Sequence, residues 1–212
     1  MHIRTTAVVC SARPHGETGV VARVMTAEFG LMAVFVAGGR GRHLRPVLIP
    51  GNGVEAQIMA RGGGAMPSAR VELVVSRGQW MAEPLPAAAI GWVSALTSAA
   101  LPERQPFPAL AEALSPLLDA VCHAPSARGW APAILSYEAL LLRELGYGRA
   151  SAERSALPDG TDHAVLMAGF ERMGRALARD VFGDWPLAGW RGDVMGARVR
   201  LVQSLARMDA TH

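Results

Sequence analysis

Apolar and polar residues alternate through much of the first eighty positions of the chain. Residues 6–10 are apolar and partly β-branched, residues 20–25 alternate with one wetter face, and residues 31–37 form an unbroken apolar run. A period of two predicts a strand with one face in a core, and an unbroken run of this length predicts a strand buried on both faces. Alternation at 54–61 and 70–75 brings the number of predicted strands to five.

Short segments rich in Gly and Pro separate these strands. Residues 13–16 (RPHG) and 28–30 (EFG) predict turns, because Pro fixes φ and Gly accepts a positive φ. Residues 62–64, three successive glycines, end the fourth strand. Five short strands are the number in an OB barrel, although the periodicity alone also allows an SH3-like barrel.

The apolar spacing changes to three and four residues after residues 84–86 (PLP), where we place the boundary between two domains. Helices are predicted over 87–101 and 107–121, the second with Pro116 in its interior. Pro cannot continue the hydrogen bonding of a helix. We therefore expect a kink there, or a second helix that begins with Ser115 as its cap.

Three more helices are predicted in the rest of the chain. Pro132 opens the first and Gly146 ends it, and Asp162 is a suitable N-cap for the second after a small, polar loop at 149–162. The sequence thus predicts an α+β fold, with a barrel at 1–80 and a helical domain at 84–212. The expected buried stripes of the three helices are Ile134, Tyr137, Leu141 and Leu145; Leu166, Phe170, Met173, Leu177 and Val181; and Met195, Val199, Val202 and Leu205.

Charge is unevenly distributed along the chain. The net charge is +3, but residues 1–80 hold nine arginines against four glutamates. Three of these arginines, Arg40, Arg42 and Arg45, stand with three glycines and no acid in residues 38–45 (GGRGRHLR), which we call the basic loop. Glycines let a backbone approach a ligand closely, and the planar guanidinium pairs with phosphate in a fork. The loop therefore favours a polyanionic partner, although a solvated hairpin tip is the plainer interpretation.

Two motifs then indicate a family. The first is ARPHGET at 12–18, followed by a strand, the turn at 28–30 and a strand that ends in glycines and basic residues. The second is SYEALLLRELGYG at 136–148, with a matching helix around 170–182. In this order and spacing they resemble the RecO family of bacterial recombination mediators over most of the chain. The resemblance implies an OB-fold at 1–80.

Further expectations follow from the resemblance. It implies binding of single- and double-stranded DNA on the barrel, through Arg40, Arg42 and Arg45. Arg61 and Arg77 extend this candidate track, although each is interpreted more simply as an exposed arginine at a strand end. It also implies cooperation with RecR, action on strands coated by single-strand-binding protein, capture of that protein's C-terminal tail by the helical domain, RecA loading and strand annealing. No nucleotide, metal or other cofactor is expected.

Aromatic residues suited to base stacking are few in the barrel. Phe35 lies in the buried run and is expected in the core, which leaves Phe29 and Trp80. The protein is therefore expected to contact mainly the phosphate backbone of DNA and to bind it independently of base sequence. The arginines of the helix near the C-terminus, Arg172, Arg175 and Arg179, are interpreted as its solvated face.

Several chemistries are disfavoured by composition. The chain has no lysine, which excludes P-loop, Schiff-base and kinase-type lysines. The two cysteines, Cys10 and Cys122, are expected to be buried free thiols, and 149–162 lacks the cysteines that form a zinc site in some RecO relatives. No signal-peptide core and no apolar run of about 20 residues is present, so a cytoplasmic location is expected. Association with the nucleoid is expected from the resemblance to a DNA-binding family.

No catalytic motif is present, and we expect a protein that is not an enzyme. The leading alternative is a non-catalytic OB-fold RNA-binding or ribosome-associated protein, which would prefer structured RNA to single-stranded DNA. A hydrolase would require a convergent polar pocket, and the sequence offers no cluster of suitable residues.

Overall fold

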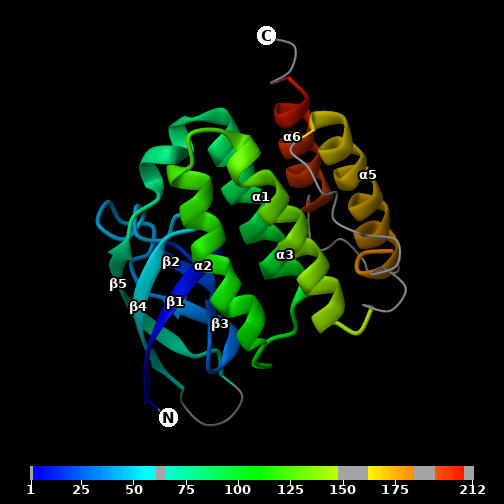
Figure 1. The fold of residues 1–212 in the computed structure, drawn as a ribbon. Helices are drawn as coiled ribbons and strands as arrows, with labels where there is room; N and C mark the ends of the chain where they lie inside the picture. The colour runs from blue at the N-terminus through cyan, green and yellow to red at the C-terminus, as the bar shows by residue number, and fades with distance from the viewer. Residues whose placement is uncertain (1, 61–64, 148–161, 184–193, 208–212) are drawn as a thin grey trace.

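The computed structural model describes residues 2–60, 65–147, 162–183 and 194–207. Its first part is a closed barrel with the strand order β1-β2-β3-β5-β4 (Figure 1). Neighbouring strands are antiparallel except β3 and β5, which are parallel and meet at Phe35 and Ser68. This five-stranded barrel is the predicted OB-fold. The strands are β1 (His2–His15), β2 (Gly19–Thr26), β3 (Gly30–Val36), β4 (Gly53–Met59) and β5 (Ser68–Val75).

Strand boundaries differ from the prediction at the first turn. Residues 13–15 continue β1 and pair with β2, so the turn is formed by residues 16–18. Gly16 takes φ +64° there, which suits a residue without Cβ. Burial follows the predicted alternation in β4, whereas in β5 Leu73 and Val75 are exposed although Val71 is buried.

Helices form the rest of the described chain. Pro116 lies inside a single helix, α2, so of the two expected alternatives, a kink or a second helix capped by Ser115, the second is wrong. Asp162 caps α5 as predicted, because its carboxylate accepts a hydrogen bond from the Ala164 amide at 3.0 Å. The elements are η1 (Gly78–Ala82), α1 (Pro84–Ala100), α2 (Pro108–His123), η2 (Ala127–Gly129), α3 (Ala131–Glu144), α5 (His163–Asp180) and α6 (Val194–Ala206).

Of the four residues predicted for the buried stripe of α6, Leu205 is buried, Met195 and Val202 are half-buried, and only the prediction for Val199 is wrong. Val199 is 51% exposed, and the buried positions are Val194, Arg198, Leu201 and Leu205. An arginine at a core position interrupts the apolar spacing, so the sequence pattern favoured the neighbouring valine. The stripes of α3 and α5 are confirmed, with Leu145 half-buried.

The barrel and the helices share apolar core. Val8, Cys10, Met25 and Leu31 belong to the same buried cluster as the helices, whereas the other barrel side chains form a second cluster inside the barrel. In Figure 1 the helices α1, α2 and α3 lie between the barrel and the outer pair α5 and α6. Within the described residues, no helix is long and apolar enough to cross a membrane.

Candidate nucleic-acid interface

The basic loop leaves β3 and is anchored against the barrel. A Cβ at Gly39 would lie 2.7 Å from the Cβ of Val20, so only glycine lets the chain lie this close to β2. Leu44 packs against the barrel core, and Leu48, three residues after the loop, is 4% exposed. The loop is therefore held against the barrel by packing, while its three arginines are exposed.

Arg40 fastens the loop to the turn between β1 and β2. Its amide donates to the carbonyl of Thr18 at 3.1 Å, and its Nη1 donates to the carbonyl of Glu17 at 2.9 Å. These contacts use backbone oxygens, so they leave the positive charge of Arg40 without a neutralising partner at the loop. The residue remains exposed.

Arg42 and Arg45 are also exposed, on either side of His43. Arg42 Nε lies 3.4 Å from His43 Nε2. Among the residues that the structure places, no acidic side chain forms an ion pair with Arg40, Arg42 or Arg45. The structure thus brings three uncompensated guanidiniums together on one loop, an arrangement that attracts anions.

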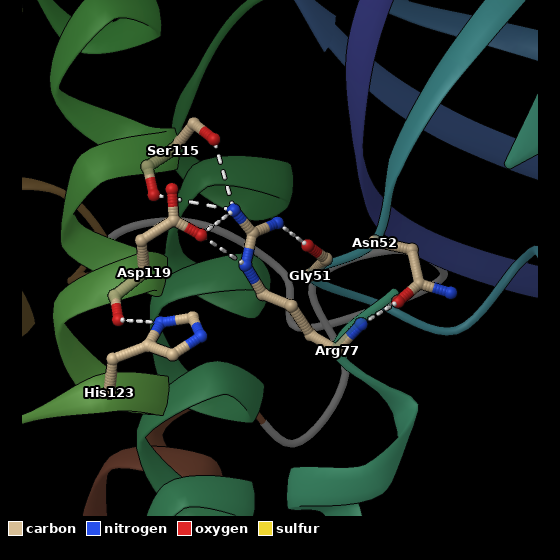
Figure 2. Close-up of polar contacts among 6 residues, drawn as sticks. All are labelled: Gly51, Asn52, Arg77, Ser115, Asp119 and His123. Carbon is tan, nitrogen blue, oxygen red and sulfur yellow. Dashed lines mark hydrogen bonds and ion pairs between the residues drawn. The ribbon is translucent and has the colours of Figure 1, made fainter. Parts of the chain in front are cut away.

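The other two arginines of the predicted track do not join this loop. Arg61 lies outside the described residues. Arg77, which we expected as an exposed arginine at a strand end, is 1% exposed, and its guanidinium contacts Asp119 and Ser115 of α2 (Figure 2). A side chain enclosed in this way cannot reach a phosphate, so Arg77 is removed from the candidate DNA-binding residues.

Aromatic residues near the loop are mostly engaged with protein. Phe35 is half-buried rather than fully in the core, and its ring lies edge-on to His15 with centroids 5.9 Å apart. Trp80 packs edge-on against His123 of α2, with centroids 5.0 Å apart. The loop itself carries no aromatic ring apart from His43. Its composition therefore suits binding to the phosphate backbone of DNA rather than base stacking.

The arginines of α5 have the features of a solvated helix face. Arg172, Arg175 and Arg179 are exposed. Arg175 lies 3.9 Å from Glu171, and Arg179 lies 2.6 Å from Asp180, so two of the three have a nearby acid. Their local charge is therefore lower than that of the basic loop.

Cysteine and metal chemistry find no support among the described residues. Cys10 and Cys122 are free and buried, as predicted. Burial raises the pKa of Cys10 to about 12 and that of Cys122 to about 11, so both thiols stay protonated at neutral pH. No group of three or more His, Cys, Asp or Glu side chains in the described ranges could hold a metal ion. Residues 149–161 of the segment predicted to lack zinc lie outside those ranges.

Two buried polar networks were missed from the sequence. Asn52, in the segment Pro-Gly-Asn-Gly at 50–53, is fully buried between Pro46, which directly follows the basic loop, and Arg77. Its neighbours indicate a turn, but a turn residue is ordinarily exposed. Glu138 and Arg198 form a buried ion pair between α3 and α6 at 3.1 Å. Neither residue carries a local sign of burial, because each partner is distant in sequence.

Comparisons with known proteins agree with these features. Residues 1–77 match the family model for the recombination protein O N terminal region, and residues 83–153 match that for its C terminal region. The DNA repair protein RecO of Rhodospirillum centenum is 39% identical over 173 residues, which cover 81% of this chain and 67% of that protein. The RecO of Phenylobacterium zucineum is 36% identical over 183 residues, covering 84% and 72%. The chain therefore belongs to the RecO family of DNA repair proteins.

Proposed function

We propose that this protein is a DNA-binding recombination mediator without catalytic activity. In this role it binds single- and double-stranded DNA and anneals complementary strands. It works with RecR on DNA coated by single-strand-binding protein, promotes RecA loading, and acts in the cytoplasm at the nucleoid. Family membership supports the DNA repair role, and the basic loop is the observation that carries the DNA-binding part.

Physical chemistry links the loop to annealing. Two complementary strands repel each other as polyanions, so a protein that brings them together must neutralise phosphates without reading bases. Arg40, Arg42 and Arg45 offer uncompensated charge on an anchored loop. We assign DNA binding to the barrel at 1–80 and protein partners mainly to the helices at 84–212.

Replacing Arg42 and Arg45 with Ala tests this proposal most cleanly, because neither guanidinium fastens the loop to the barrel. If each binds one phosphate, the log–log salt slope on single-stranded DNA falls by about 1.4, or about 0.7 for each lost contact. Adding Arg40→Ala brings the loss to roughly 2. Annealing of complementary strands slows in parallel, and the loss is similar for different base sequences. Fluorescence anisotropy over a salt series measures the slope.

The control matched to the triple loop variant (Arg40, Arg42 and Arg45) is the triple Ala variant at Arg172, Arg175 and Arg179, which also removes three positive charges, from the α5 face. Its salt slope should stay close to that of the parent protein. A larger change in this control than in the loop variant would place the DNA on the helices instead. Tighter binding of structured RNA than of single-stranded DNA would favour the RNA-binding alternative.

The acidic tail of single-strand-binding protein is assigned to the helical part. Arg128, on η2, and Arg143, near the end of α3, are both exposed, and Arg143 has one neighbouring acid, Glu144, at 3.5 Å. Arg128→Glu with Arg143→Glu should weaken binding of a fluorescent tail peptide, while the loop variant keeps it. The assignment fails if the loop variant loses the peptide and the charge-reversed variant does not.

A further inference from the structure

Asn52 joins the end of the basic loop region to the buried interior. Its side-chain amide donates to the carbonyls of Pro46 at 2.8 Å and Val47 at 3.2 Å, and its amide oxygen accepts from the Arg77 backbone N–H at 2.7 Å. These partners define which end of the amide is nitrogen, because a reversed amide would face two carbonyls with its oxygen. Only a side chain with both a donor and an acceptor end satisfies the site.

Arg77 continues this path from the barrel into the helical part (Figure 2). Its Nη1 donates to the carbonyl of Gly51, directly before Asn52. Its Nε and Nη2 both donate to Asp119 Oδ1, at 3.2 and 2.6 Å, and Nη2 also donates to Ser115 Oγ at 3.0 Å. One buried cation therefore contacts the chain that follows the basic loop and two residues of α2.

The geometry leaves the basic loop dependent on α2. On one side the loop is held by Arg40 against the turn between β1 and β2, and by Gly39 against β2. On the other side, residues 46–51 are held through Asn52 and Arg77, and the guanidinium of Arg77 has its counter-charge on Asp119. A charge buried to this extent requires that partner, because an unpaired buried cation is costly.

We propose that Asn52, Arg77 and Asp119 are positioning residues through which α2 fixes the conformation of the basic loop. They set the affinity for DNA without touching it, a consequence that rests on the proposed function. A partner or variant that displaces α2 at Asp119 loosens the loop, so the docking of the helices and the binding of DNA are coupled.

The first test compares Asp119→Ala with Glu112→Ala, an exposed acid on the same helix that forms no ion pair with Arg77. Hydrogen exchange reports on the basic loop through the amides of Leu44 and Arg45, which donate to the carbonyl of Gly41, and on the adjoining segment through the amide of Leu48, which donates to the carbonyl of Leu44. Asp119→Ala should speed their exchange and leave residues 20–25 of β2 unchanged, whereas Glu112→Ala should change neither. We call the proposed path from α2 through Asp119, Arg77 and Asn52 to the basic loop the relay. Unchanged exchange in Asp119→Ala overturns the relay, whatever the effect of the substitution on DNA binding.

The second test measures binding of single-stranded DNA by the same two variants. Each removes one negative charge, so general electrostatics predicts slightly tighter binding for both. The relay predicts the opposite for Asp119→Ala: binding roughly threefold to tenfold weaker and a salt slope smaller by about 0.7 to 1.4. Equal or tighter binding by Asp119→Ala overturns the coupling to DNA.

Failure of the relay can be told apart from failure of the proposed function. If the Arg42–Arg45 variant binds DNA normally, the assignment of the DNA-binding surface to the basic loop is wrong. If the Arg42–Arg45 variant binds DNA more weakly and Asp119→Ala binds it normally, the relay is wrong. Circular dichroism confirms the fold. Should Asp119→Ala unfold, Asp119→Asn against Glu112→Gln gives the same comparison with the shape kept.

Asn52→Asp tests the relay from the loop side. The substitution keeps the size of the side chain but replaces the donor end by an oxygen that faces two carbonyls. It should speed exchange in the loop and weaken DNA binding, although Asn52 is fully buried and cannot itself contact DNA. Gln57→Glu, on β4, adds the same charge and serves as the control. Equal losses in the two variants would mean that charge alone is responsible, and would overturn the role of Asn52.

Discussion

Glu138 and Arg198 illustrate what a buried charge requires of its surroundings. Arg198 donates to both carboxylate oxygens at 3.1 Å, and its Nη2 also donates to the carbonyl of Phe170 at 2.7 Å. Trp92 Nε1 adds a donor to Glu138 at 2.7 Å, and the guanidinium lies 5.6 Å from the centroid of the Trp92 ring. Burial raises the pKa of Glu138, and Arg198 and Trp92 oppose that rise. The pair joins four helices through a single contact group.

Glu138→Gln should lower the free energy of unfolding by about 3 kcal/mol, since it leaves a buried cation without its counter-charge. The matched control is Glu171→Gln, which breaks an ion pair with Arg175 in which both side chains are about 70% exposed. Solvent screens that pair, so no measurable loss is expected. Urea unfolding at pH 7 measures both. Similar losses in the two variants would show that the buried pair is not a stabilising contact.

The sequence could predict the environment of a residue where the cause lies in neighbouring residues, but not where it lies in residues distant in sequence. Arg40, Arg42 and Arg45 were predicted on an exposed loop because glycines and the end of an apolar run are local signals. The burial of Arg77 was not predictable in this way, since it depends on Asp119, 42 residues later. Asn52 was missed for the same reason. Buried polar contacts are made by tertiary structure, and no local period records them.

Elements were predicted best where caps and period agree. Asp162, Pro132 and Gly146 placed helix ends, and all five strands were found. The errors lie where one residue can belong to two patterns: Pro116 is compatible with a break but is tolerated within α2, and Arg198 displaced the apparent stripe of α6. The effect of replacing a glycine depends on its surroundings in the same way, because it is set by the atoms that an added Cβ would contact.

Gly30 and Gly91 should respond in opposite directions to replacement by Ala. Gly30, at the start of β3, has φ +68°, and a Cβ there would overlap the backbone oxygen of Gln105. Gly30→Ala should destabilise the protein by at least about 2 kcal/mol. Gly91, in α1, has nothing within 4 Å of such a Cβ. Gly91→Ala should stabilise by about 0.5 to 1 kcal/mol, because Ala favours helix.

Thermal and urea unfolding distinguish the two glycine variants. The expected contrast depends on the connection at 101–106, where the Arg104 amide donates to the carbonyl of Leu31 at 2.8 Å and places Gln105 beside β3. A small effect of Gly30→Ala would mean that this connection moves away easily, and that the barrel and helices are joined more loosely than the structure indicates.

At the scale of the whole molecule, the barrel and the helices complete each other. Four barrel side chains lie in the core of the helical part, and Arg23 of β2 reaches across to the Ser98 carbonyl and to Glu103 at 3.2 Å. Arg77 makes the second such crossing. The change of period after residues 84–86 marks a change of architecture, while the contacts between the two architectures could not be predicted from either half.

A fragment of residues 1–82 should therefore not fold alone. It would expose Val8, Met25 and Leu31 to water and leave Arg23 and Arg77 without their partners on the helices. A domain of this size is only marginally stable. The free-energy cost of exposed apolar surface and unpaired cations should therefore exceed the stabilisation that the small barrel core provides. Circular dichroism should show no cooperative thermal transition for the fragment under conditions where the full chain melts cooperatively. Extending the fragment through residues 83–212 in the same chain should restore the transition. Dispersed amide resonances from the isolated fragment would contradict this prediction and would mean that the barrel folds, and can bind DNA, independently of α2.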